Sequence, residues 1–291
     1  MKADITPAVG KLRVFRRLMS RRSAVAAMLV LALVVIPCAA APLFARYDPS
    51  AQPDIIALRS QPPSFAHPFG TDPFSRDVLS RVLYGGRVSL AVALIATLVS
   101  ITFGTAYGAV AGFAGGAVES EMMRLLDALL SIPRLLLLIA VFAAWRQLPL
   151  PAFVLIVGFT GWYGLSRVVR GQVLALKGQD FVASARALGA GRARILMNHI
   201  LPNVLTPVIV AAALGVGHVI LLEAGLSYLG VGVQQPQPSW GNIIQDGSDQ
   251  IARLWWISFF PGVAIVVTVM AFNILGDALR EALEPRQTGA G

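Results

Sequence analysis

The chain has 291 residues, of which 56% are hydrophobic and only 13% are charged, and its mean hydropathy is +0.70. This composition excludes an ordinary soluble globular protein and predicts an integral membrane protein. The formal net charge is +9, but the basic residues gather in two segments, so membrane topology explains the charge better than nucleic-acid binding does. We expect a lipid membrane around this chain and no nucleic acid as a partner.

Residues 1–23 form a basic N-terminal segment, and an apolar run follows at residues 24–45. Secretory signal peptides share this pattern, and Cys38-Ala-Ala-Ala41 resembles a cleavage site. The apolar run, however, continues to Phe44, which is longer than the usual hydrophobic region of a signal peptide. We therefore expect an uncleaved first transmembrane helix. Cys38 is the only cysteine, so no intrachain disulfide can form.

Apolar runs of about 20 residues, the length that a helix needs to cross a bilayer, recur along the chain. The fold class that they predict is all-α: a polytopic membrane protein with about six transmembrane helices. The predicted spans are residues 24–45, 89–113, 122–145, 151–167, 204–228 and 256–276. Residues 46–88 then form an extracytoplasmic segment, residues 89–283 a five-helix core and residues 284–291 a cytoplasmic tail.

The basic residues predict the orientation of the spans. Thirteen of the 24 Lys and Arg residues lie in two segments, seven before Ser23 and six between Ser166 and Asn203. An even number of spans puts both segments on one side, which the positive-inside rule makes the cytoplasm. Both termini are then cytoplasmic. The arginines at positions 46, 59, 76, 81 and 87 fit poorly outside, and one alternative is that residues 77–87 form an interfacial helix.

Glycine and proline predict how the helices pack. Glycines recur every four residues at positions 104, 108, 112 and 116, and a second set stands at positions 158, 161 and 164. Such stripes of small residues are typical of close contacts between membrane helices. The prolines at positions 133, 207 and 261 each interrupt hydrogen bonding inside a predicted span, and the kinks that they cause favour a protein that moves.

Ionisable residues in the predicted spans are candidates for a translocation pathway, and these are Asp127, Arg134 and Glu223. Arg134 falls near the middle of the third span, where a charge is costly unless it meets water or a partner. Asp127 lies roughly 10 Å away along the same helix, and Glu223 in the fifth span is a second candidate partner. A buried ion pair and a pathway role are both open for Arg134.

Residues 181–203, FVASARALGAGRARILMNHILPN, predict a basic helix-turn-helix. Gly189 begins a short run that permits the positive φ angles of a tight turn, and Pro202 is expected to end the second helix. The two apolar faces consist of Phe181, Ala185 and Leu188 in the first helix and of Ile195, Leu196 and Ile200 in the second. This geometry suits docking into a groove of a soluble partner.

The same segment resembles the coupling motif of bacterial ABC-importer permeases, in which a short alanine-rich helix, a glycine and a later Leu-Pro contact an external ATPase. Ala183 stands where the motif has an acid, and Ser184 where it has its first alanine. The resemblance implies a coupling loop at residues 171–203 with ATPase-coupling residues Ala183, Ser184, Ala185, Arg186, Gly189, Leu201 and Pro202. The alternative is a loop that is basic for topology alone.

Motifs of enzymes are missing from the chain. It contains no G-x-x-x-x-G-K-[ST] phosphate loop, no H-E-x-x-H and no G-x-S-x-G. The histidines at positions 67, 199 and 218 are scattered, and the best acid–base candidate, His218 with Glu223, is more typical of an interhelical hydrogen bond. We expect a non-catalytic chain without a cofactor or metal, so any ATP is bound by another chain.

Aromatic residues mark the segment before the last span. Trp240, Trp255 and Trp256 suit an anchor at the membrane interface. The Gly- and Pro-rich surroundings of Trp240 also suit a shaped surface or gate that faces an outer partner, and Asn242 would then be a site for crosslinking to that partner.

Several further blocks resemble the C-type permease of the dipeptide/oligopeptide/nickel ABC importers, in order over residues 67–286. They are His67-Pro-Phe-Gly-Thr-Asp72, Arg76-Asp77-Val-Leu-Ser-Arg81, Ser131-Ile-Pro133, Glu223-Ala-Gly-Leu-Ser-Tyr-Leu-Gly230, Pro238-Ser-Trp-Gly241 and Ala271-Phe-Asn-Ile-Leu-Gly-Asp277. The resemblance implies a type I importer core in a bacterial inner membrane. It also implies a homologous second permease, two cytoplasmic ATPases that use ATP and Mg, and an extracytoplasmic solute-binding protein.

The expected function is that of a permease subunit that forms a pathway for peptides or related small solutes by alternating access. The solute class is open among dipeptides, oligopeptides, nickel chelates and others. The alternative functions are an energy-independent channel and a structural membrane subunit.

Overall fold

The computed structural model describes residues 16–145 and 148–283, and it has no strand within these ranges. Four stretches are long and apolar enough to cross a membrane, and two bent helix pairs raise the number to six if each pair is one span. The predicted fold class is therefore confirmed. The helices are α2 (Arg22–Ala39), α3 (Ala41–Phe44), α4 (Val78–Ala114), α5 (Gly116–Leu130), α6 (Arg134–Ala143), α7 (Leu150–Phe159), α8 (Tyr163–Lys177), α9 (Asp180–Ala187), α10 (Arg192–Ile195), the π-helix η1 (Leu196–Ile200), α11 (Leu201–Tyr228), α12 (Trp240–Ser248) and α13 (Trp255–Leu283).

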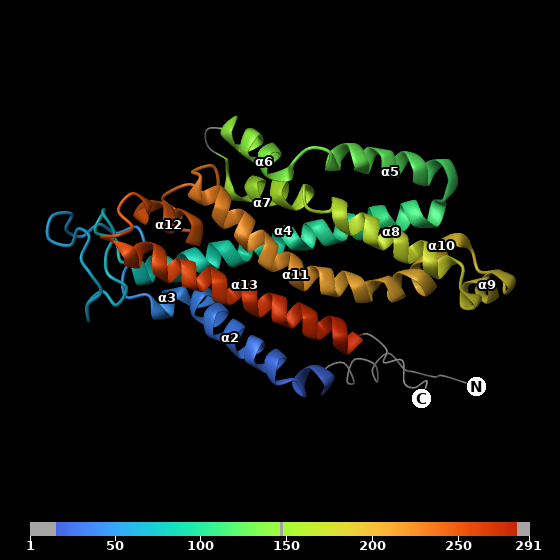
Figure 1. Ribbon diagram of the computed structural model, residues 1–291, viewed down its shortest axis with the longest axis horizontal. Coiled ribbons are helices and arrows are strands. Elements are labelled where there is room, and N and C mark those ends of the chain that lie inside the picture. The colour runs from blue at the N-terminus through green and yellow to red at the C-terminus, as the bar shows by residue number, and fades with distance from the viewer. Residues whose placement is uncertain (1–15, 146–147, 284–291) are drawn as a thin grey trace.

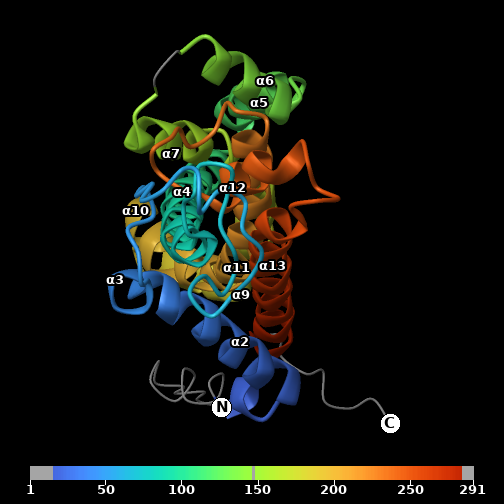
Figure 2. The same cartoon turned by 90° about the vertical axis from the view of Figure 1, so that its left-hand side faces the viewer.

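The bundle is elongated, and its two ends differ in structure (Figure 1). The irregular residues 45–77, α3 and α12 lie at the left-hand end, which we name the cap end. The short helices α9 and α10 lie at the right-hand end, which we name the coupling end. Figure 2 looks onto the cap end, where the irregular segment and α12 lie in front of α4 and α13.

The long helix α4 runs through the centre of the bundle. It begins after Asp77, whose carboxylate accepts a hydrogen bond from the backbone N–H of Ser80 at 2.8 Å and so caps the helix. Its 37 residues span about 55 Å. Residues 78–88 form the first turns of this one helix, so no break separates them from the span predicted at residues 89–113, and the start of that span in the membrane stays a prediction. Gly86 stays helical there and allows the indole of Trp240 to approach.

The glycine stripe of α4 faces α8. A Cβ added at Gly104 would lie 3.0 Å from the carbonyl oxygen of Trp162, and the corresponding distances to carbonyl oxygens of α8 are 2.5 Å at Gly108 and 2.9 Å at Gly112. The predicted close packing is confirmed for these three positions. Gly116 differs, because it begins α5 with a φ of +60° and has no neighbour within 4 Å of an added Cβ. In the second set, the glycines at positions 158 and 161 pack against α4 and that at position 164 lies open.

The third and fourth predicted spans are each broken into two helices. α5 and α6 form an angle of 69° across residues 131–133, and α7 and α8 form an angle of 41°. The predicted interruption at Pro133 is confirmed, and it divides this predicted span into two helices. Pro133 provides no backbone N–H and disfavours the helical conformation of the residue before it. Arg134 is consequently the first residue of α6 and does not lie in mid-helix.

Residues 180–203, which we name the coupling segment, continue into a membrane helix without a break. α10, η1 and α11 together form one candidate span from Arg192 to Tyr228. The expectation that Leu201-Pro202 ends the second short helix is therefore wrong. The π-helical turn η1 changes the hydrogen-bond pattern immediately before α11, at the place where Pro202 provides no backbone N–H.

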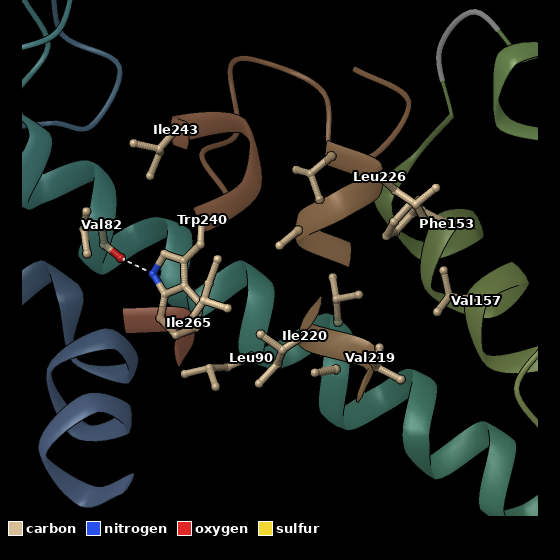
Figure 3. Packing of buried hydrophobic residues seen from close by; sticks show 14 of the residues in the cluster. Val82, Leu90, Phe153, Val157, Val219, Ile220, Leu226, Trp240, Ile243 and Ile265 are labelled. Atoms are coloured by element: carbon tan, nitrogen blue, oxygen red, sulfur yellow. Dashed lines mark hydrogen bonds between the residues drawn. The ribbon is translucent and has the colours of Figure 1, made fainter. Parts of the chain in front are cut away.

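The main hydrophobic core lies near the cap end (Figure 3). Trp240 of α12 is completely buried and points toward α4, with Leu90, Ile220 and Ile265 from three helices nearby. Its indole N–H donates to the carbonyl oxygen of Val82 at 3.0 Å. This core therefore joins α12 to the membrane helices.

Candidate functional site

The coupling segment, residues 180–203, begins with α9. This helix buries Val182 and Ala185 against its own chain, whereas Phe181 and Leu188 are 40% and 88% exposed. The predicted apolar face is thus divided: Ala185 packs inward, and Phe181 and Leu188 stay open. Phe181 and Leu188 stand seven residues apart, so they lie toward the same side of the segment and both are accessible to a partner.

A tight turn follows α9. Gly189 has a φ of +82°, which confirms the predicted left-handed conformation. The N–H of Ala190 donates to the carbonyl oxygen of Ala185 at 3.0 Å and closes the turn. No atom lies within 4 Å of a Cβ added at Gly189, so the backbone conformation alone requires glycine there.

Buried side chains fix the coupling segment to the membrane helices. They form one hydrophobic cluster that includes Val182 and Ala185 of α9, Ile195 of α10, Ile200 of η1, Val169 and Val173 of α8 and Val204 of α11. This shared cluster is a route by which a displacement of α9 can reach α8 and α11.

The other residues of the coupling motif lie on the surface of this segment. Ala183, Ser184, Arg186 and Pro202 are exposed, and Leu201 is half-buried. Where the family motif has an acid, this chain presents the small side chain of Ala183. The assignment of these residues to ATPase coupling stays a prediction.

The three ionisable pathway candidates do not meet one another. Asp127 forms an ion pair with Arg167 of α8, and the two side chains are 61% and 51% exposed. Arg134 donates to the carbonyl oxygen of Val157 at 2.8 Å and to the hydroxyl of Thr160 at 3.3 Å. The ion pair considered for Arg134 is therefore replaced by neutral acceptors at the end of α7, and its pathway role stays a prediction.

Glu223 is completely buried in α11 and accepts hydrogen bonds from two hydroxyl groups. Ser89 of α4 donates to Oε2 at 2.7 Å, and Ser227 donates to Oε1 at 2.6 Å. These hydroxyls in turn accept from the backbone N–H groups of Trp240 and Val233. The carboxylate therefore positions α12 and the loop before it on α4, and in this conformation it lines no open surface.

A buried network of charges closes the cap end. Arg76 donates to Asp72 at 2.5 Å and to Asp246 of α12 at 2.9 Å. Arg81 pairs with the same two carboxylates, at 2.9 Å for Asp246. All four side chains are at most 10% exposed. Two positive and two negative charges therefore balance within the cap and join residues 72–81 to α12.

Sequence reasoning missed this network and instead counted Arg76 and Arg81 against the topology. Their partner Asp246 lies 170 and 165 positions further along the chain, so spacing could not reveal it. The available signal was local: Asp72 and Asp77 alternate with the two arginines. Because both arginines are paired inside the cap, they are no evidence against an outer location of this segment.

The tryptophans do not act as one membrane anchor. Trp240 and Trp256 are buried, and the indole N–H of Trp256 donates to the carbonyl oxygen of Thr71 at 3.1 Å. The anchor interpretation is wrong for these two residues, and of the three tryptophans assigned to the anchor Trp255 alone is exposed. Asn242 is buried as well, because it completes the capping box of α12, so it is not accessible for crosslinking.

The residues considered for a metal site or an acid–base pair do not come together in the described part of the chain. Among residues 16–145 and 148–283, no group of three or more His, Cys, Asp or Glu side chains could hold a metal ion. His218 is exposed whereas Glu223 is buried, so the two do not face a common pocket.

Comparison with known proteins gives two family matches. Residues 100–289 match the model described as "binding-protein-dependent transport system inner membrane component". Residues 12–63 match that of the N-terminal transmembrane domain of oligopeptide transport permease C.

Similar proteins span almost the whole chain. The oligopeptide transport system permease protein OppC of Escherichia coli (strain K12) is 42% identical, with 93% of this chain and 89% of the relative covered. The protein of the same name in Bacillus subtilis (strain 168) is 38% identical, with 93% and 88% covered. The dipeptide transport system permease protein DppC of Bacillus subtilis (strain 168) is 37% identical, with 94% and 84% covered.

Proposed function

The chain belongs to the family of binding-protein-dependent transport system inner membrane components, and from that premise we propose that it is the permease subunit of a bacterial ABC importer for peptides. The relatives named above are oligopeptide and dipeptide permeases that match more than nine-tenths of this chain. Peptides are therefore the first solutes to test, before nickel chelates and other small solutes.

The coupling segment is the observation that carries this proposal. It offers Phe181 and Leu188 to a partner and is fixed to α8 and α11 by buried side chains. A soluble ATPase that binds this surface can move two membrane helices through one rigid contact. A loop that is basic for topology alone needs neither the exposed apolar pair nor the packed connection.

The proposed assembly contains this chain, a homologous second permease, two cytoplasmic ATPases and an extracytoplasmic solute-binding protein. ATP and Mg bind to the ATPases, and this chain carries no cofactor. The coupling end and both termini then face the cytoplasm, and the cap end faces the solute-binding protein. The exposed basic residues of the coupling end, Arg186, Arg192 and Arg194, suit this orientation.

The proposed mechanism is alternating access. Binding of ATP closes the ATPase pair and displaces α9, and the packed contact carries this motion to α8 and α11. The bend between α7 and α8 and the proline inside α11 are places where these helices can change angle. The nucleotide shifts the equilibrium only if the closed ATPases bind one state of the permease more tightly than the other.

Uptake by the reconstituted assembly tests this function. The chain would be purified with the second permease and the ATPases of the same genome, placed in liposomes and supplied with the solute-binding protein and labelled dipeptides or longer peptides. We expect uptake that requires ATP and stops when the phosphate-loop lysine of the ATPases is replaced. Solute flux that proceeds without ATP would identify a channel instead. Uptake of nickel chelates but not peptides would overturn the proposed substrate.

A further inference from the structure

Residues 17–21, which precede α2, and the end of α13 together form a small polar pocket at the coupling end. The pocket has a volume of about 190 Å³ and is lined by Arg17, Ser20, Arg21, Glu281 and Ala282. It is separate from the coupling segment and from the cap.

Small buried side chains bring the two segments together there. Leu18 and Ala24 pack against Ala278 and Ala282 of α13. Arg17 donates to the carbonyl oxygen of Ala282 at 3.3 Å. Because this is a long hydrogen bond to a neutral acceptor, most of the donor capacity of the Arg17 guanidinium is open to a ligand.

The charge around the pocket favours an anion. Arg16 and Arg22 flank the lining residues Arg17 and Arg21. Glu281, which pairs with Arg21, is the acid among the lining residues. These four arginines and one glutamate carry a formal excess of three positive charges.

Exposed apolar side chains lie on α13 on the cap side of the pocket, beyond the exposed Asp277. Ile274 and Met270 stand seven and eleven residues before Glu281, so they lie on nearly the same face of the helix. Both side chains are exposed. A basic pocket at the end of two membrane helices, with exposed apolar side chains about two and three turns further along α13, has the two parts that a phospholipid needs: one for a phosphate and one for an acyl chain.

We propose that this pocket binds an anionic phospholipid of the cytoplasmic leaflet, with its phosphate held by Arg17 and an acyl chain along Ile274 and Met270. The leaflet follows from the orientation given under the proposed function, whereas lipid binding itself does not depend on transport. Basic pockets between membrane helices on the cytoplasmic side are suited to anionic headgroups. The lipid would then hold the N-terminal helix against the end of α13.

Lipid binding by the purified permease complex tests this site. Native mass spectrometry in detergent would measure the binding of phosphatidylglycerol, of phosphatidylcholine with matched chains, and the effect of inorganic phosphate. We expect Arg17→Gln to weaken phosphatidylglycerol binding about fivefold, the effect of one cation near a lipid surface. The matched control Arg22→Gln changes the same charge outside the pocket and should have a clearly smaller effect.

Two further results bear on the site. Ser20→Phe fills the pocket and keeps every charge, so it should also weaken phosphatidylglycerol binding. Equal binding of the two lipids, or equal effects of Arg17→Gln and Arg22→Gln, would overturn the proposal in favour of diffuse charge attraction. Displacement of the lipid by inorganic phosphate would indicate a site for free anions. Peptide uptake is measured separately, so its failure would count against the proposed function and not against this site.

Discussion

Sequence motifs mark both the coupling end and the cap end, but the motif side chains differ in how far they are buried and in what they contact. In the coupling segment, Phe181 and Leu188 are exposed, and only one side of α9 packs against the rest of the chain. The cap buries its charged residues and satisfies them within the same chain, through Asp72, Arg76 and Asp246. A sequence motif can therefore mark either a surface for another protein or a set of stabilising contacts within the chain. Burial and hydrogen bonding distinguish the two cases.

The difference has a mechanical consequence. Polar contacts at the cap connect residues that are far apart in sequence, so this end behaves as one closed unit. At the coupling end, α9 is joined to the bundle by a hydrophobic cluster, through which a displacement of α9 can reach the membrane helices. Damage to the cap should thus lower stability, and damage to the coupling turn should lower transport while the fold persists.

The largest expected loss of stability comes from Asp72→Ala. Arg76 and Arg81 would then share one carboxylate, that of Asp246, inside the protein. Removal of one partner from a buried ion pair costs about 3–5 kcal/mol. We expect a strongly lowered melting temperature of the purified protein and poor assembly with the partner subunits.

The matched control for this prediction is Asp249→Ala. Asp249 is exposed just after α12, so the substitution removes the same charge without opening the network. If the two variants melt at the same temperature, the cap network is not the set of stabilising contacts that its geometry indicates.

The next effect is a loss of transport in Gly189→Val. A β-branched residue at a φ of +82° is strained by about 1–2 kcal/mol or more, so the turn should change its shape. We expect the protein to insert and melt nearly as before, but ATP-dependent uptake should be abolished and ATPase association weakened.

Gly191→Val provides the control in the same loop. Gly191 has a φ of −65°, which valine adopts without strain, and no atom lies within 4 Å of its added Cβ. This variant should retain uptake. Normal solute-stimulated ATPase activity in Gly189→Val would contradict a coupling role for the turn.

A third test concerns Arg134, which belongs to neither end. Its acceptors are a carbonyl and a hydroxyl, so Arg134→Gln leaves no carboxylate unpaired. We expect normal assembly and a stability loss of about 1–3 kcal/mol from the lost hydrogen bonds. If Arg134 lines the pathway, uptake of peptides with a free carboxylate should fall more than that of peptides with an amidated C-terminus.

The control is Arg124→Gln, because Arg124 is exposed and pairs with Glu121 one turn away. Equal losses of uptake for both kinds of peptide in Arg134→Gln would assign Arg134 to the bend between helices and exclude charge selection.

Much of the fold could be predicted from local sequence. Apolar runs predicted about six spans, the stripe from Gly104 to Gly112 predicted a close contact with another helix without identifying it, and Gly189 predicted the turn. Each of these depends on a few neighbouring residues and on the conformation that they prefer. The sequence blocks that resemble importer permeases, found in the same order along the chain, likewise predicted the family.

The errors have a common physical cause. The burial of Trp240 and of Trp256 depends on which helices and loops lie alongside, and no short stretch of sequence reveals that. The same is true of the cap, where Arg76 meets a carboxylate 170 residues away. A proline or tryptophan has several structural roles, and the tertiary contacts select among them.

The smallest expected effect comes from the ion pair of Asp127 with Arg167, which is the counterpart of the cap network in the half of the bundle toward the coupling end. It also joins two helices, α5 and α8, but its side chains are more than half exposed. Water screens such pairs, so their contribution is about 0–1 kcal/mol. Asp127→Asn should therefore lower the melting temperature by much less than Asp72→Ala, and added salt should remove even this small difference. A salt-independent loss as large as that of Asp72→Ala would show that burial does not separate the two ends, and the comparison on which these tests rest would fail.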